Sequence, residues 1–111
     1  MNFKKIPFEQ NTLTALSDEQ IAAAKKEFGD IYLIQVDGLC VYMHAPDRRI
    51  IDLAQTSAVK RPSLFEETII INCWLAGNKE VLDESNPRLF YAVARKVSEI
   101  VQVADAEVKK L

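Results

Sequence analysis

The hydrophobic pattern of the chain centres on residues 62–78, the most apolar stretch and the one that contains the only tryptophan. The apolar residues of its main face follow one another at helical spacing: Phe65, Ile69, Cys73 and Ala76. Ser63 and Glu66 have the spacing of a capping box, and Gly77 is suited to end a helix. Further apolar side chains cover most of the circumference. We therefore predict a buried central helix that ends at Gly77.

The same stretch can also be interpreted as a strand, because the isoleucines at 69–71 have high strand propensity. A strand would place Cys73 and Leu75 on one face with two of these isoleucines. Its other face would then carry Asn72 and Trp74, which is a poor alternation of apolar and polar positions. The pattern favours the helix.

Two apolar runs, residues 31–36 and 39–44, flank the dipeptide Asp37-Gly38. This dipeptide is typical of the type I′ turn of a two-residue β-hairpin. The resulting register places three apolar pairs on one face: Val36 with Leu39, Ile34 with Val41, and Tyr32 with Met43. The opposite face is mixed: Ile31, Leu33, Gln35, Cys40, Tyr42 and His44. Because a lone hairpin is marginal in water, it needs a packed helix, a third strand from the N-terminal segment or a second subunit.

The remaining pattern predicts three more helices and one uncertain segment. A capping box from Ser17 to Gln20 opens the first helix, and Gly29 ends it. The second begins at Pro46 or Asp47. Its stripe is Ile50, Leu53, Ala54 and Ala58. Residues 1–14 alternate apolar and polar side chains, which is compatible with an edge strand or a loose arm.

The last and longest helix is predicted to start with Asn86 as N-cap and Pro87 as its first residue. Its apolar stripe extends to the last residue of the sequence: Phe90, Val93, Val97, Ile100, Ala104, Val108 and Leu111. Such a stripe packs within the domain or against a second copy of the chain. Together these elements predict an α+β fold in which an antiparallel hairpin packs with four helices.

Composition narrows the classes of protein that fit. A chain of 111 residues suits a single domain, and a net charge of −2 argues against a dedicated nucleic-acid binder. Cys40 and Cys73 lack metal or CxxC spacing, so we expect buried thiols and a cytoplasmic location. Residues 2–5 are polar and no apolar run follows, so we expect neither a signal peptide nor a membrane span.

Few residues are candidates for chemistry. His44 is the only histidine, and Cys73 lies among isoleucines where nothing in the sequence would activate its thiol. We therefore predict a protein that is not an enzyme and that holds no metal or cofactor. The most basic region is Arg48, Arg49, Lys60 and Arg61. It can contact phosphate or an acidic protein surface, or it can be a solvated helix face.

Three motifs carry a resemblance to a known family. They are Tyr42-x-His44-x-Pro46-x-Arg48-Arg49, Asn72-Cys73-Trp74-Leu75-Ala76-Gly77 and Ala106-Glu107-Val108-Lys109-Lys110-Leu111. Over residues 17–111 the chain resembles small tail assembly chaperones encoded among phage and prophage genes.

The resemblance implies a non-enzymatic protein of the bacterial host cell that binds tail proteins such as tape measure or tube subunits. Its partner-binding candidates are His44, Arg48, Arg49, Lys60 and Arg61. The alternative hypothesis is a small regulatory module that contacts nucleic acid through the basic region.

Overall fold

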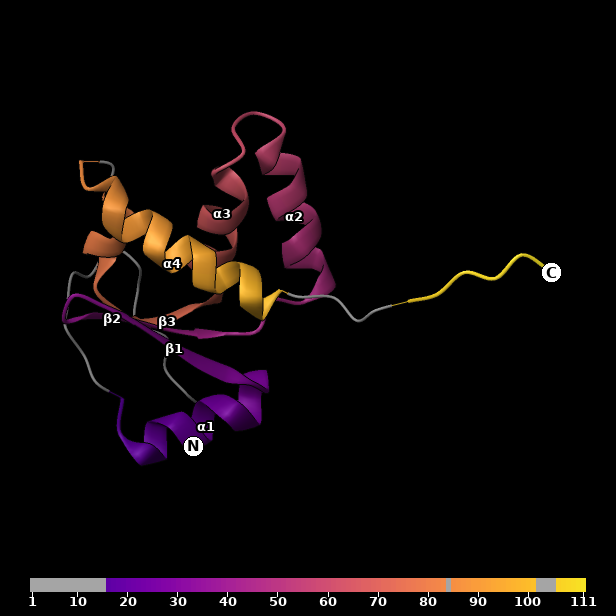
Figure 1. Cartoon of the computed structure of the whole chain (residues 1–111). Helices are drawn as coiled ribbons and strands as arrows, with labels where there is room; N and C mark the ends of the chain where they lie inside the picture. The colour runs from indigo at the N-terminus through magenta and orange to yellow at the C-terminus, as the bar shows by residue number, and fades with distance from the viewer. Residues whose placement is uncertain (1–15, 84, 102–105) are drawn as a thin grey trace.

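The computed structural model describes residues 16–83, 85–101 and 106–111 (Figure 1). Its elements follow in the order α1 (Asp18–Phe28), β1 (Ile31–Val36), β2 (Leu39–His44), α2 (Arg48–Ala58), α3 (Leu64–Cys73), β3 (Trp74–Gly77), the 3-10 helix η1 (Lys79–Leu82) and α4 (Pro87–Ile100). The predicted α+β class is confirmed. The third strand is β3 and pairs with β2, whereas the predicted N-terminal arm or strand lies outside the described residues.

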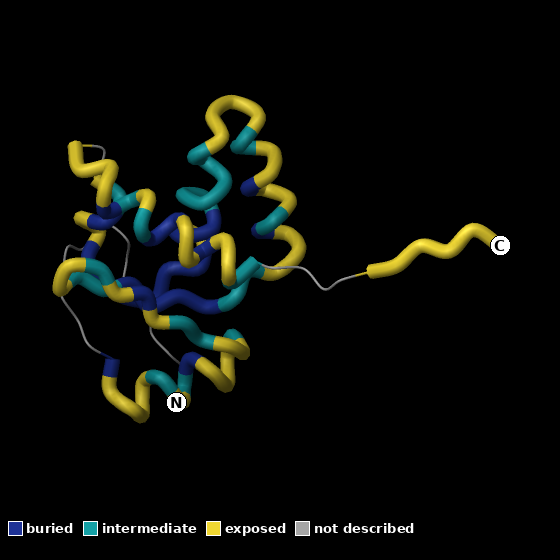
Figure 2. Tube along the Cα trace, in the orientation of Figure 1, coloured by how far each residue is buried: buried dark blue, intermediate teal, exposed yellow. Residues whose placement is uncertain are grey.

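The antiparallel sheet, in the order β1-β2-β3, separates two layers of helices. Figure 1 shows α1 on one side and α2, α3 and α4 on the other. The larger hydrophobic core lies under the three helices, and a smaller core lies between the sheet and α1. Figure 2 shows the burial concentrated at the sheet and at the helix faces turned toward it. Among the described helices, none combines the length and apolar character that crossing a membrane requires.

The hairpin has the predicted register. Asp37 and Gly38 have φ angles of 49° and 78°, the positive values that a type I′ turn requires at both central positions. Val36 pairs with Leu39, and the pairing continues to Ile31 with His44. The uniformly apolar face joins the larger core. On the mixed face α1 covers Tyr42 and leaves Leu33 46% exposed.

The boundaries of α1 are also as predicted. The Ser17 hydroxyl accepts a hydrogen bond from the Gln20 amide at 3.2 Å, and the Gln20 side chain accepts one from the Ser17 amide at 2.9 Å. Gly29 follows the helix with a φ of 84°. The reciprocal bonds satisfy two donors that the first turn would otherwise leave without a partner.

In α2 the Asp47 side chain accepts from the Ile50 amide at 2.9 Å, so Asp47 is the N-cap. Ile50 and Ala54 are buried as predicted, but Leu53 is 49% exposed. The apolar stripe is therefore narrower than predicted, because α2 lies at the outside of the helical layer and packs mainly against α3.

The start of the central helix differs from the prediction. Ser63 has helical backbone angles and makes no capping bond. The carbonyls of Arg61, Pro62 and Ser63 accept from the amides of the first turn instead. The predicted capping box is absent because Ser63 has helical rather than extended backbone angles, and a capping residue is typically extended.

The end of the central helix was predicted wrongly as well. The helix α3 stops at Cys73, and Trp74–Gly77 forms β3. The strand lacks alternation because both of its faces are buried: Trp74 enters the larger core, and Leu75 and Ala76 enter the smaller one. Two consecutive residues share a face because the pairing with β2 is irregular between Tyr42 and Met43.

The helix α3 is buried on one side rather than all round. Ile69, Ile70 and Cys73 are fully buried, whereas Ile71 is 37% exposed. The sheet lies against one face of α3, and α2 covers only part of the rest.

The last helix is shorter than predicted. Pro87 is its first residue, but the Asn86 side chain makes no cap bond and the helix ends at Ile100. Val108 and Leu111 have no secondary structure and are 97% and 114% exposed, and Ala104 lies outside the described residues. Helices in proteins are stabilised mainly by the packing of an apolar face. Val108 and Leu111 do not pack against the core, so nothing of this kind stabilises a helix there.

Two neighbouring isoleucines of α3 provide a test of this packing. We expect Ile70→Asp to unfold the domain, because a carboxylate at a fully buried position has no ion to pair with. The cost should exceed about 4 kcal/mol, a large part of the stability of a typical domain. Urea unfolding followed by circular dichroism measures it.

Ile71→Asp is the matched control, because the same charge one residue later remains in contact with water. It should fold with a much smaller loss of stability. Equal losses for the two variants would contradict the orientation of α3.

Candidate functional site

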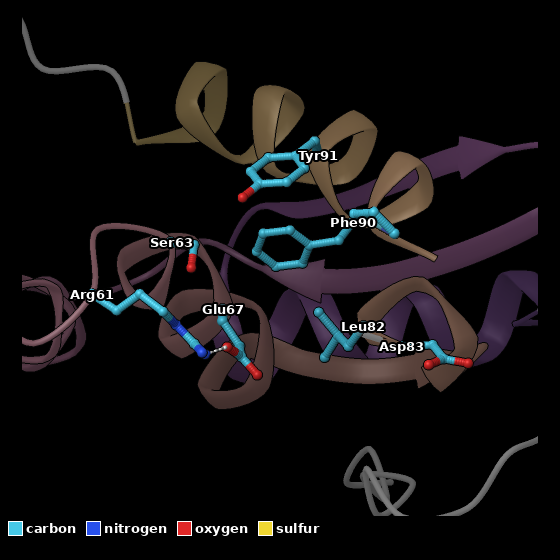
Figure 3. Close-up of a pocket in the computed structure, with 8 residues that line it drawn as sticks. Arg61, Ser63, Glu67, Leu82, Asp83, Phe90 and Tyr91 are labelled. Carbon is cyan, nitrogen blue, oxygen red and sulfur yellow. Dashed lines mark ion pairs between the residues drawn. The ribbon is translucent and has the colours of Figure 1, made fainter. Parts of the chain in front are cut away.

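A surface cleft of about 260 Å³ lies where the start of α3, the end of η1 and the start of α4 meet (Figure 3). Its lining combines apolar and charged side chains: Arg61, Ser63, Glu67, Leu82, Asp83, Pro87, Phe90 and Tyr91. The residues come from three separate parts of the sequence. The cleft therefore exists only in the folded domain.

The apolar part of the cleft is built mainly by two successive aromatic residues of α4. Phe90 is half-buried and packs against the larger core, while Tyr91 is 58% exposed. Their rings meet edge to face, with centroids 5.2 Å apart and planes at 79°. Leu82 completes the apolar surface from η1. Figure 3 shows both aromatic side chains beside the cleft with Leu82 across from Phe90.

Charged groups border this apolar surface. The Arg61 guanidinium lies 3.5 Å from the Glu67 carboxylate, and the two side chains are 55% and 27% exposed. A pair that exposed contributes little to stability, so a bound molecule can replace either partner at small cost. Two carboxylates and one guanidinium thus surround the cleft.

Asp83 is held in its charged form by its neighbour Ser85. The Ser85 amide and hydroxyl donate to Asp83 Oδ1 at 2.9 and 2.8 Å. These bonds favour the carboxylate and lower the pKa of Asp83 below its ordinary value. Asp83 therefore keeps its negative charge to a lower pH than an isolated aspartate.

The apolar surface and the bordering charges together suit an apolar side chain with a cation beside it.

The structure does not gather the predicted basic residues into one patch. Arg48 and Arg49 open α2, whereas Lys60 and Arg61 lie beyond its end. At 1.5 Å per residue, the 11-residue helix is about 16 Å long, and the two pairs lie at its opposite ends. All four are exposed, but of the four only Arg61 lines the cleft, and it faces Glu67.

His44, the fifth predicted partner-binding residue, is only 8% exposed. Its ring stacks on Phe28 of α1 with centroids 4.6 Å apart and planes at 6°. Nδ1 lies 2.8 Å from the Ala45 carbonyl oxygen. These contacts give His44 a packing role beneath α1, on the opposite side of the sheet from α2.

Both cysteines are free thiols, but the predicted burial is complete for only one of them. Cys73 is fully buried in the larger core. Cys40 is half-buried, and burial raises the pKa of its thiol. Over the described residues, no cluster of three or more histidine, cysteine, aspartate or glutamate side chains is arranged to hold a metal ion.

Most of the cleft was missed by sequence reasoning. Only Arg61 was among the candidates. Phe90 was predicted as part of the apolar stripe of the last helix, and Glu67, Asp83 and Tyr91 were not singled out. One signal was present in the sequence. Tyr91 is a large aromatic residue just outside the apolar stripe of α4, and such a residue is a candidate for contact with a partner.

Comparisons with known proteins add no relative. No family model matches the chain, and no match was found among curated proteins or solved structures. Functional inference therefore depends on the residues and their geometry.

Cysteine labelling tests the environment of the two thiols. We expect iodoacetamide to leave Cys73 unmodified in the folded protein and to modify it after denaturation, because the side chain is fully buried. Cys40 should react slowly, and its rate should rise at higher pH than that of free cysteine because its pKa is raised. Mass spectrometry of digested samples measures both. Rapid labelling of Cys73 in the native state would contradict its place in the core.

Proposed function

We propose that this chain is a non-enzymatic assembly protein that binds tail proteins of a phage or prophage in the cytoplasm of the bacterial host. The partners would be tape measure or tube subunits. The sequence motifs that resemble tail assembly chaperones support this class of partner. The structural observation that supports the proposed interaction is the cleft between α3, η1 and α4.

The size of the cleft favours a protein segment as its occupant. Sites that enclose a small molecule usually measure about 300–1,000 Å³. A cleft of about 260 Å³ holds one or two side chains of a segment whose remainder lies along the surface. Tyr91 has the features of a binding hot spot, because it is aromatic, exposed and packed against the half-buried ring of Phe90.

The charges around the cleft restrict the segment further. Glu67 and Asp83 favour a lysine or arginine next to the apolar anchor, while Arg61 opposes a second cation at its end of the cleft. An apolar side chain adjacent to one basic residue satisfies this arrangement. A segment rich in acidic residues does not.

Binding to purified tape measure and tube proteins tests the proposal. Tyr91→Ala should weaken binding at least about tenfold, because losing an aromatic hot spot costs about 2 kcal/mol or more and about 1.4 kcal/mol is already tenfold. Isothermal titration measures the dissociation constant. Leu53→Ala is the control, because Leu53 is exposed to a similar extent but lies on α2.

Two results would overturn the proposal. One is the absence of binding to both tail proteins by the folded wild-type chain. The other is equal weakening of binding by Tyr91→Ala and Leu53→Ala, which would show that the partner does not bind at the cleft.

A further inference from the structure

The outer edge of β1 is unpaired among the described residues. The sheet order β1-β2-β3 places β2 in the middle, so β1 has a neighbour on one side only. Natural edge strands are usually protected by charges, proline or a bulge. The sequence of β1, Ile-Tyr-Leu-Ile-Gln-Val, contains neither charge nor proline, and its pairing with β2 is regular. This edge is therefore suited to accept another strand.

The hydrogen bonds of β2 show which groups of β1 point outward. The Cys40 amide donates to Asn78 Oδ1 at 3.0 Å, and the Asn78 amide donates to the Cys40 carbonyl at 2.9 Å. Cys40 thus directs its backbone groups away from Gln35, its partner in β1. Because these directions alternate along an antiparallel pair, Ile31, Leu33 and Gln35 present their amides and carbonyls at the free edge.

A shallow groove runs beside this edge. It has a volume of about 230 Å³ and lies between β1 and the end of α4. Lys96 and Glu99 line it from α4, 3.3 Å apart, and their side chains are 57% and 66% exposed. Leu33 lines it from β1 and is 46% exposed. The edge thus has apolar surface at its centre and both signs of charge beside it.

We propose that a second copy of this chain occupies the edge, with the two β1 strands antiparallel about a two-fold axis at Leu33. Each Leu33 then faces the other, and each Ile31 faces Gln35 of the second copy. The outward groups of the two strands form about six backbone hydrogen bonds. The two sheets join into one.

Charge complementarity identifies a second copy as the occupant. An axis perpendicular to the sheet keeps the two α4 helices on the same face. It therefore brings the two grooves, each bordered by Lys96 and Glu99, to the same face of the joined sheet. A groove edge with one lysine and one glutamate is its own complement, as a symmetric interface requires. The inference is independent of what the cleft binds.

The test uses opposite charges at the proposed axis. Leu33→Lys and Leu33→Glu each place two like charges face to face, so each variant should dissociate with a constant at least about tenfold above that of the wild-type dimer. An equal mixture of the two should recover a dimer, because lysine then faces glutamate. Sedimentation velocity of the full chain measures the masses, and circular dichroism confirms that each variant is folded.

Leu53→Lys is the control. Leu53 is 49% exposed on α2, so this variant gains the same charge at a similar exposure but should remain dimeric. A monomeric wild type would overturn the proposal. So would a dimer that Leu33→Lys leaves intact, or a mixture of the Leu33 variants that stays monomeric while both are folded.

Discussion

The docking of β3 against β2 is the contact on which the rest of the fold depends. At Gly77 a Cβ atom would meet the Cys40 carbonyl oxygen and would lie 2.9 Å from the Val41 Cα. The strands approach this closely because residue 77 has no side chain and has a φ of 147°. Asn78 then closes the pairing with two hydrogen bonds to the Cys40 backbone.

Several features follow from this docking. It carries Trp74 into the larger core and Leu75 and Ala76 into the smaller one, so a single short strand joins the helical layers on both faces of the sheet. It also fixes where η1 and α4 begin. The cleft exists because η1 returns the chain beside the start of α3, and the groove at β1 exists because α4 then crosses the sheet toward its opposite edge.

Elements with strong local signals were predictable from the sequence. Asp37-Gly38 determines the turn and the register of the hairpin, and the Ser17 capping box determines the start of α1. The central segment was only half predictable. Gly77 was interpreted as the end of a helix, but its role depends on the approach of Cys40, which is distant in the sequence. The apolar stripe of α4 was extended too far because periodicity does not show where the core ends.

The candidate surfaces were less predictable than the fold. The cleft combines residues from Arg61 to Tyr91 with no motif that links them. The four basic residues appeared as one region in the sequence, but the length of α2 separates them. The hairpin was predicted to need a packed helix, a third strand or a second subunit. Only the packed structure shows which residues of the mixed face α1 covers. It also shows that Leu33 stays exposed at the edge of the sheet.

The most direct test of this account compares alanine at two glycines that both have positive φ. Gly29 has open space around it, so Gly29→Ala should cost only the backbone strain, about 1–3 kcal/mol of unfolding free energy. Gly77→Ala adds a collision with the β2 backbone, so its loss should be clearly larger. Urea unfolding of both variants measures the difference. An equal or smaller loss for Gly77→Ala would contradict the central place of the contact between β3 and β2.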